Sequence, residues 1–229
     1  MKNFLLVFLL TSFSLLHSQN VTTFAGSGVS GQSDGAGTEA SFMRANGVKL
    51  DNLGNLYVLD LHKIRKITPE GLVTTIGGGN SAGSQDGLLA DATFSEPLAL
   101  VFDSQWNLFI LDSGNSKIRK ISTSGVVSTF AGSGYAISID GVGLDASFKY
   151  LKGITIDEND NLYVSEYGGK IRKVSSSGVV TTIAGKEQAG YRDGNGIDAL
   201  FQYPTGLYYK SGSIYIADTY NSRIRKLNI

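Results

Sequence analysis

The sequence predicts an all-β fold, a β-propeller of four blades, from two observations. An Asp-Gly motif recurs as DGAGTEASF, DGLLADATF, DGVGLDASF and DGNGIDALF, beginning at Asp34, Asp86, Asp140 and Asp193, in steps of 52, 54 and 53 residues. Two further motifs, of the VTT and IRK types, keep the same step. A phosphate or metal loop is normally needed once per site, so four copies in phase indicate a structural unit repeated four times.

Each repeat contains four short strands. Runs rich in β-branched and aromatic residues are found at residues 55–60, 107–112, 161–166 and 213–218, and a shorter strand precedes each of them at 47–51, 99–103, 153–157 and 206–210. The IRK and VTT strands follow, separated by turn formers such as TPEG and STSG. The strands are apolar on both faces, so each four-stranded antiparallel sheet needs cover on both sides, as in a propeller.

The order of the strands raises the question of ring closure. The chain opens with a VTT strand at Val21 and ends with an IRK strand around Arg225, which leaves the last blade one strand short. We predict that the strand from Val21 completes the last blade and covers its edge. The alternative is an open arc that pairs with a second chain.

The hairpins DSGNSKIRK and DTYNSRIRK, from Asp112 and Asp218, resemble NHL repeats. The first and third hairpins, DLHKIRK and EYGGKIRK, are shorter and lack the Asn. The resemblance covers nearly all of residues 21–229 and implies an NHL-like propeller; NHL propellers commonly have six blades. The positions that carry it are Asp112, Asn115, Lys117 and Ile118, and Asp218, Asn221, Arg223 and Ile224.

Residues 1–18 have the features of a secretory signal peptide. One Lys precedes an apolar run from Phe4 to Leu16, which is shorter than the roughly 20 residues of a spanning helix. We predict a secreted or periplasmic protein with one propeller domain at 19–229 and no membrane insertion after leader removal. The chain has 20 basic and 20 acidic residues, so its charge does not indicate nucleic-acid binding. It has no cysteine, which excludes disulfides and cysteine-ligated zinc.

The Asp-Gly loops admit two interpretations. The structural one has the Asp accepting backbone N–H bonds and the later Ala and Phe wedged between blades. The acid just before the Ala then pairs with the Arg of the IRK motif, or else the two carboxylates of each loop help to hold Ca²⁺. We favour the structural interpretation, because Ca²⁺ needs more oxygens than two carboxylates provide. The acids are Glu39, Asp91, Asp145 and Asp198, and the arginines are Arg65, Arg119, Arg172 and Arg225.

A metal-dependent propeller lyase or lactonase-like hydrolase is the alternative function. Such a site needs imidazoles or carboxylates that converge from the inner strands. Outside the leader the sequence has one histidine, His62, and the mouths of the inner strands carry one carboxylate, Glu96. We therefore predict no catalytic set, no metal site and no cofactor.

The tyrosines distinguish the second half of the chain. Ten of the eleven lie at or beyond residue 135, six of them in loops that propeller geometry places on one face. Exposed aromatic residues suit recognition, so we predict a binding module for a protein, peptide or glycan, either a monomer or a homodimer. The predicted ligand-binding residues are Tyr135, Tyr167, Tyr191 and Tyr220. Tyr150 and Tyr203 share a phase of the repeat and are interpreted as packing residues.

Overall fold

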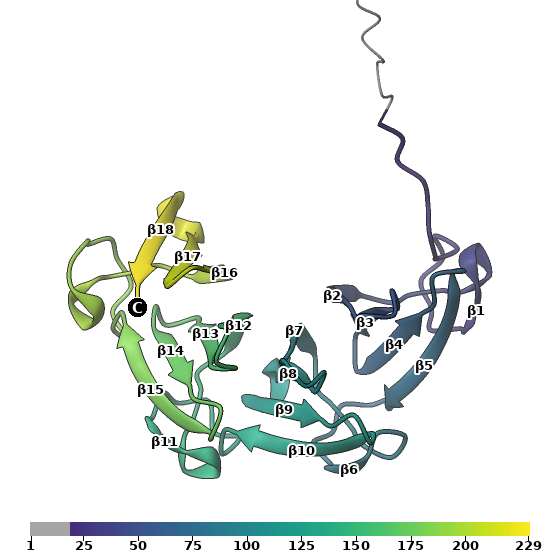
Figure 1. Ribbon diagram of the computed structural model, residues 1–229, viewed down its shortest axis with the longest axis horizontal. Coiled ribbons are helices and arrows are strands. Elements are labelled where there is room, and N and C mark those ends of the chain that lie inside the picture. The colour runs from purple at the N-terminus through teal and green to yellow at the C-terminus, as the bar shows by residue number, and fades with distance from the viewer. Residues whose placement is uncertain (1–18) are drawn as a thin grey trace, which may run out of the picture.

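A computed structural model describes residues 19–229, and the predicted signal peptide lies outside the described residues. The chain forms four antiparallel sheets arranged as the blades of a propeller, which confirms the predicted fold class (Figure 1). The first sheet contains β1 (Gly35–Ala36), β2 (Ala45–Leu50), β3 (Leu56–Asp60), β4 (Lys63–Ile67) and β5 (Leu72–Gly78). The second contains β6 (Gly87–Leu88), β7 (Pro97–Phe102), β8 (Leu108–Asp112), β9 (Lys117–Ile121) and β10 (Val126–Ala131).

The third and fourth sheets follow the same plan, but the fourth is smaller. The third contains β11 (Gly141–Val142), β12 (Leu151–Ile156), β13 (Leu162–Glu166), β14 (Ile171–Val174) and β15 (Val179–Ala184). The fourth contains only β16 (Pro204–Lys210), β17 (Ser213–Asp218) and β18 (Arg223–Asn228). Five single-turn 3₁₀ helices lie in the connections: η1 (Gly37–Glu39), η2 (Ser113–Asn115), η3 (Gly143–Asp145), η4 (Gly196–Asp198) and η5 (Thr219–Asn221).

The Asp-Gly loop contributes a short outer strand that the sequence did not predict. In the first three sheets the residues after the Asp form β1, β6 and β11, and each pairs antiparallel with the VTT strand of its own sheet, β5, β10 or β15. The VTT strand is thereby held between the IRK strand on one side and the loop on the other. In the fourth sheet the equivalent loop has no VTT strand to pair with.

The predicted closure by the strand from Val21 is wrong in this structure. Residues 21–25 belong to no strand, Val21 is fully exposed, and the last sheet keeps three strands. Figure 1 shows why: the four sheets form an open arc, and the N-terminal segment leaves the first sheet on the opposite side of the opening from β18. Because a strand can add only to a sheet that lies beside it, this segment cannot reach the fourth sheet.

Adjacent blades pack through apolar clusters anchored as the repeats predict. Ala92, Phe94, Ala146 and Phe148 are buried, and clusters of apolar residues run from each sheet into the next. The inner strands approach so closely that a Cβ added to Gly153 would overlap the carbonyl oxygen of Thr205 in the next blade. The relative orientation of neighbouring sheets is therefore fixed by close contacts.

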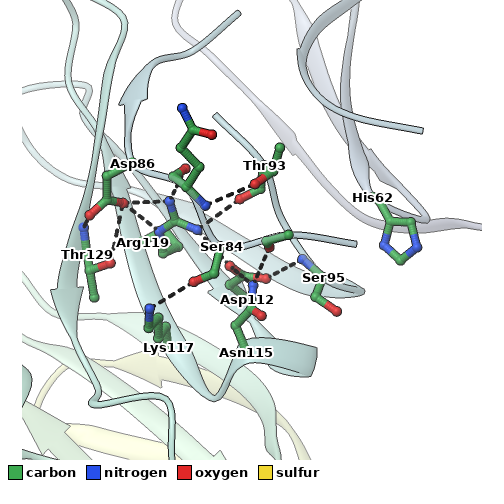
Figure 2. Close-up of polar contacts among 12 residues, drawn as sticks. His62, Ser84, Asp86, Thr93, Ser95, Asp112, Asn115, Lys117, Arg119 and Thr129 are labelled. Carbon is green, nitrogen blue, oxygen red and sulfur yellow. Dashed lines mark hydrogen bonds and ion pairs between the residues drawn. The ribbon is translucent and has the colours of Figure 1, made fainter. Parts of the chain in front are cut away.

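A buried arginine organises each blade, and we call it and its partners the arginine network. In the second blade Arg119 is fully buried and donates to Asp112 Oδ2 at 2.8 Å and to Asp86 Oδ1 at 2.5 Å (Figure 2). It also donates to the carbonyl oxygens of Thr93 and Gln85, and its guanidinium lies 5.0 Å from the Phe94 ring centroid. The same contacts recur around Arg65, Arg172 and Arg225.

The network corrects one prediction about the loops. The carboxylates that pair with the arginines are the Asp of the Asp-Gly motif and the acid that ends the second strand of the blade. The acid before the Ala is exposed in every repeat, and Asp198 pairs instead with Lys186 at 3.4 Å. In every blade the side chain of the Asp-Gly Asp lies over the sheet against the arginine, whereas the later acid of the same loop faces solvent.

We expect the Arg119→Met variant to lose about 3–5 kcal/mol of unfolding free energy, because Asp112 would remain buried without a counter-charge. This corresponds to a fall in melting temperature of about 6–20 °C, measurable by calorimetry. The matched control is Lys120→Met at the next position, outside the network, which should change stability by less than about 1 kcal/mol. Equal effects of the two variants would show that the network does not stabilise the fold.

The network also predicts how stability depends on pH. Burial raises the pKa of Asp86, but the hydrogen bonds from Thr129 and the charge of Arg119 outweigh it and hold that pKa below its ordinary value of 3.8. A carboxyl group of lowered pKa stabilises the fold fully above its unfolded-state pKa and loses this effect as pH falls through the folded-state pKa. The difference in melting temperature between the parent and Asp86→Asn should therefore be largest near neutrality and shrink below about pH 4. A difference that stays constant from pH 6 to pH 3 would contradict this.

Candidate ligand-binding face

Four tyrosines of the third and fourth blades form one continuous exposed group, the tyrosine ladder: Tyr150, Tyr167, Tyr203 and Tyr220. Tyr150 and Tyr167 meet edge to face at 6.1 Å between ring centroids, and Tyr167 meets Tyr203 edge to face at 4.9 Å. Tyr203 and Tyr220 are stacked at 4.7 Å. The exposed fractions of Tyr150, Tyr167 and Tyr220 are 52%, 49% and 63%, so the ladder is a surface feature and not part of the core.

The arginine network positions the ladder. Tyr150 and Tyr203 stand immediately before the inner strands β12 and β16, and the preceding backbone N–H groups, of Lys149 and Gln202, donate to the carboxylates of Glu166 and Asp218. These carboxylates pair with Arg172 and Arg225 in the network. The backbone that presents the two tyrosines is therefore tied to the most buried polar groups of the blade.

Tyr150 and Tyr203 adopt left-handed backbone conformations, with φ values of 54° and 56°. This conformation is uncommon for a bulky residue. Glu96 has φ 46° at the same position of the second blade, so the conformation belongs to the repeat and not to the tyrosines. This backbone directs Tyr150 and Tyr203 toward the surface, although their equivalent places in the repeat led to their interpretation as packing residues.

Polar groups border the ladder. Lys152 Nζ lies 5.3 Å from the centroid of the Tyr203 ring and 6.0 Å from that of Tyr167, close enough for a cation–π interaction. The hydroxyls of Thr205 and Thr219 lie 2.8 Å apart and are hydrogen-bonded to each other. The face thus combines aromatic rings, the ammonium group of Lys152 and two threonine hydroxyls that can donate or accept hydrogen bonds.

The first two blades differ at the corresponding positions. Arg44 and Glu96 stand where Tyr150 and Tyr203 stand in the later blades, and they form an exposed ion pair at 2.9 Å. The ladder is therefore not required by the repeat, whereas the arginine network, present in every blade, is.

The four tyrosines predicted from the sequence fall into separate places. Tyr167 and Tyr220 belong to the ladder. Tyr191 lies in the last Asp-Gly loop, where its hydroxyl donates to Asp193 Oδ2 at 2.9 Å and its ring lies 3.9 Å from the Arg223 guanidinium carbon. Tyr135 is exposed in the connection between β10 and β11, away from the aromatic contacts of the ladder. Tyr150 and Tyr203, which the sequence analysis interpreted as packing, complete the group.

The structure also places the residues relevant to metal chemistry. Within residues 19–229, no group of three or more His, Cys, Asp or Glu side chains is arranged to hold a metal ion. His62 Nδ1 accepts the backbone N–H of Glu96 at 3.2 Å. The Asp-Gly carboxylates are occupied by protein donors: Asp34 accepts bonds from Arg65 and from the backbone and hydroxyl of Thr75. In the same range, none of the helices is long and apolar enough to cross a membrane.

Comparison with known proteins agrees with this architecture. The model of the NHL repeat matches residues 201–227, which contain Asp218, Asn221 and the IRK motif of the last blade. NHL repeat-containing protein 2 from Bos taurus is 32% identical over 170 residues, 67% of this chain and 23% of that protein. The chain belongs to the NHL-repeat β-propeller family. In this NHL propeller the Asn has a structural role, because Asn221 Nδ2 donates to Asp218 Oδ2 and to the carbonyl of Gly190.

Two other similar proteins are larger than the part they share with this NHL propeller. Human teneurin-4 is 28% identical over 224 residues, which span 83% of this chain and 8% of teneurin-4. The crystal structure of an auxiliary nutrient binding protein from Bacteroides ovatus matches with a TM-score of 0.67 at 22% identity, covering 82% of this chain and 49% of that one. The chain therefore spans less than a quarter of teneurin-4 and of the bovine protein, and the structural match shows the fold.

We expect removal of divalent metals by a chelator to leave the melting temperature of this NHL propeller unchanged within about 1 °C. The Asp-Gly carboxylates already accept bonds from Arg and Thr in the first three blades, and Asp193 accepts them from Arg225 and Tyr191. Differential scanning fluorimetry with and without added Ca²⁺ provides the measurement. An increase of several degrees with Ca²⁺ would assign a ligand role to Asp34 and its equivalents.

Proposed function

We propose that this NHL propeller is an exported, non-catalytic binding module that holds a segment of a protein, peptide or glycan on the tyrosine ladder. The observation that carries the proposal is the ladder itself: four tyrosines joined by three successive ring contacts, three of them about half exposed or more, on two adjacent blades. An exposed aromatic cluster of this kind marks a recognition surface more often than a packing surface.

The chemistry of the ladder supports binding of an amphipathic segment. Tyrosine provides a large apolar area at a small cost in side-chain entropy, and its hydroxyl can still hydrogen-bond to a polar ligand. Lys152 adds one positive charge beside the rings, which favours ligands that carry a carboxylate or a partial negative charge. The backbone of the ladder is fixed by Glu166 and Asp218, so little ordering is needed when a ligand binds.

Two further considerations support the proposal. The similar fold from Bacteroides ovatus is described as a nutrient binding protein, and a binding role suits the face of this chain as well. The predicted leader at residues 1–18 supports export, which would present the ladder to ligands outside the cytoplasm.

We expect the double variant Tyr167→Ala/Tyr220→Ala to weaken binding of a ligand identified on peptide and glycan arrays by about tenfold or more, because buried interface tyrosines commonly contribute 1.4 kcal/mol or more. Its melting temperature should stay within about 3 °C of the parent, since both side chains are exposed. Surface plasmon resonance on the array hit measures the affinity.

The matched control is Tyr135→Ala/Tyr191→Ala, which removes two other exposed loop tyrosines without touching the ladder. This control should retain the parental affinity. If the ladder variant binds as the parent does and the control loses binding, the site lies in the loops of Tyr135 and Tyr191. If both variants bind as the parent does, the site does not involve these four tyrosines.

A further inference from the structure

Within residues 19–229, the last blade has no strand at the position that the VTT strand takes in the other blades. In the first three blades the VTT strand lies between the IRK strand and the Asp-Gly loop, as β10 lies between β9 and β6. In the fourth blade the corresponding space is a hollow of about 410 Å³ lined by Asp193, Gly194 and the outer edge of β18 at Arg225 to Leu227. We call this hollow the acceptor groove.

The polar groups of the groove show what is missing. In the complete blades the Asp of the Asp-Gly motif accepts the backbone N–H and the hydroxyl of the second Thr of the VTT strand, at Thr75, Thr129 and Thr182. Asp193 lacks this partner and accepts bonds from Arg225 and the Tyr191 hydroxyl. A carboxylate has about four acceptor positions, so Asp193 can accept a strand without releasing Tyr191.

The same chain carries an unused segment of matching sequence. Val21–Thr22–Thr23 aligns with Val73–Thr74–Thr75, yet residues 21–25 belong to no strand and Val21 is fully exposed, whereas Val73 is fully buried. The register of the complete blades, in which Val127 faces Ile121 and Thr129 faces Arg119, would set Val21 opposite Leu227 and Thr23 opposite Arg225.

Each end of the arc exposes an apolar residue whose equivalents in the other blades are buried between neighbouring blades. The Ile of the IRK motif is fully buried in the first three blades, but Ile224 is 74% exposed. At the other end Val48 is 57% exposed, whereas its equivalents Leu100 and Ile154 are 5% and 8% exposed. Within the arc these two positions share one apolar cluster, as Ile64 and Leu100 do and as Ile118 and Ile154 do.

The segment cannot fill the groove of its own chain in this arrangement. Gly26 already follows the repeat pattern, because its N–H donates to Gly37 O just as that of Gly132 donates to Gly143 O. Five residues before this anchor reach about 17 Å at most, so the strand can join only a sheet directly beside the first blade. The fourth blade lies across the opening, and tightening the arc would disturb the close contacts at Gly47 and Gly153.

We propose that the acceptor groove of one copy takes the Val21–Phe24 strand of a second copy, and that two copies close a ring of eight blades by exchanging these strands. The fourth blade of each copy then packs on the first blade of the other, burying Ile224 against Val48. In this ring of two copies the two junctions are identical and related by a two-fold axis, and eight blades lie within the usual range for propellers.

Charge variants of the strand test this proposal. The protein expressed from its full sequence should have the mass of two chains by size-exclusion chromatography with light scattering. Val21→Asp and Ile224→Asp should each give the mass of one chain. The matched control is Thr22→Asp, which places the same charge one residue along the strand. Its equivalents Ser128 and Thr181 are exposed in complete blades, so this variant should keep the mass of two chains.

Because Val21 and Ile224 are exposed in the single chain, the two disruptive variants should retain their fold, and circular dichroism checks this. Mixing Val21→Asp with Ile224→Asp should restore a two-chain species, since one junction of the mixed pair is intact. A parent protein of single-chain mass at 50 μM, open-ended polymers, or equal effects of Val21→Asp and Thr22→Asp would each overturn the proposal.

A cross-link distinguishes exchange from closure within one chain. The natural sequence has no cysteine, so Val21→Cys combined with Leu227→Cys supplies the only two thiols of the chain, and a disulfide between them spans the predicted register. Val21→Cys alone and Leu227→Cys alone are the controls, because they detect bridges between the same position of two chains. Exchange predicts two covalently joined chains on a non-reducing gel. A disulfide found only within single chains would show that the strand returns to its own last blade and would refute the proposal.

Discussion

A guanidinium buried without compensation would destabilise this fold by several kcal/mol, and the geometry of each blade follows from avoiding that cost. Arg119 presents donors in a planar fork, and its partners are two carboxylates and two backbone carbonyls from three different parts of the repeat. Satisfying one side chain therefore fixes the Asp-Gly loop, the end of the second strand and the loop before the inner strand. The Phe94 ring closes one side of the cation and couples this polar centre to the packing between blades.

The network also separates what the repeat must conserve from what it can vary. The groups that touch the arginine are alike in all four blades, whereas the residue just before the inner strand is Arg44, Glu96, Tyr150 or Tyr203. The left-handed backbone found at Glu96, Tyr150 and Tyr203 directs the side chain outward. Substitution of this side chain therefore changes the surface and leaves the packing of the core intact. A recognition face can therefore diverge from blade to blade on a constant framework, which is how the tyrosine ladder arises on two blades only.

Much of the fold could be predicted from the sequence because its signals are local and repeated four times. Strand positions, the buried Ala and Phe anchors and the blade count follow from such signals. The pairing of Val21 could not be predicted, because the sequence of a strand does not specify which sheet lies beside it. The choice between Asp34 and Glu39 as the partner of Arg65 was equally open in the sequence, since both carboxylates lie in one loop and the local pattern does not show which of them points toward the sheet. For the ladder, the signal that could have identified Tyr150 and Tyr203 was the Glu96 of the second repeat, a charged residue at a position interpreted as packing.

The open arc and the ladder are linked by symmetry. Two copies that close a ring are related by a two-fold axis along the propeller axis, and such a rotation leaves each ladder on the same face of the ring. A ligand with a repeating structure, such as a glycan or a repetitive peptide, could then contact both ladders, and the second contact would be intramolecular. Weak binding by one exposed group of tyrosines would in that case become tight binding by the ring, although no residue of the ladder changes. The unfilled strand position in the fourth blade would then determine affinity as well as assembly.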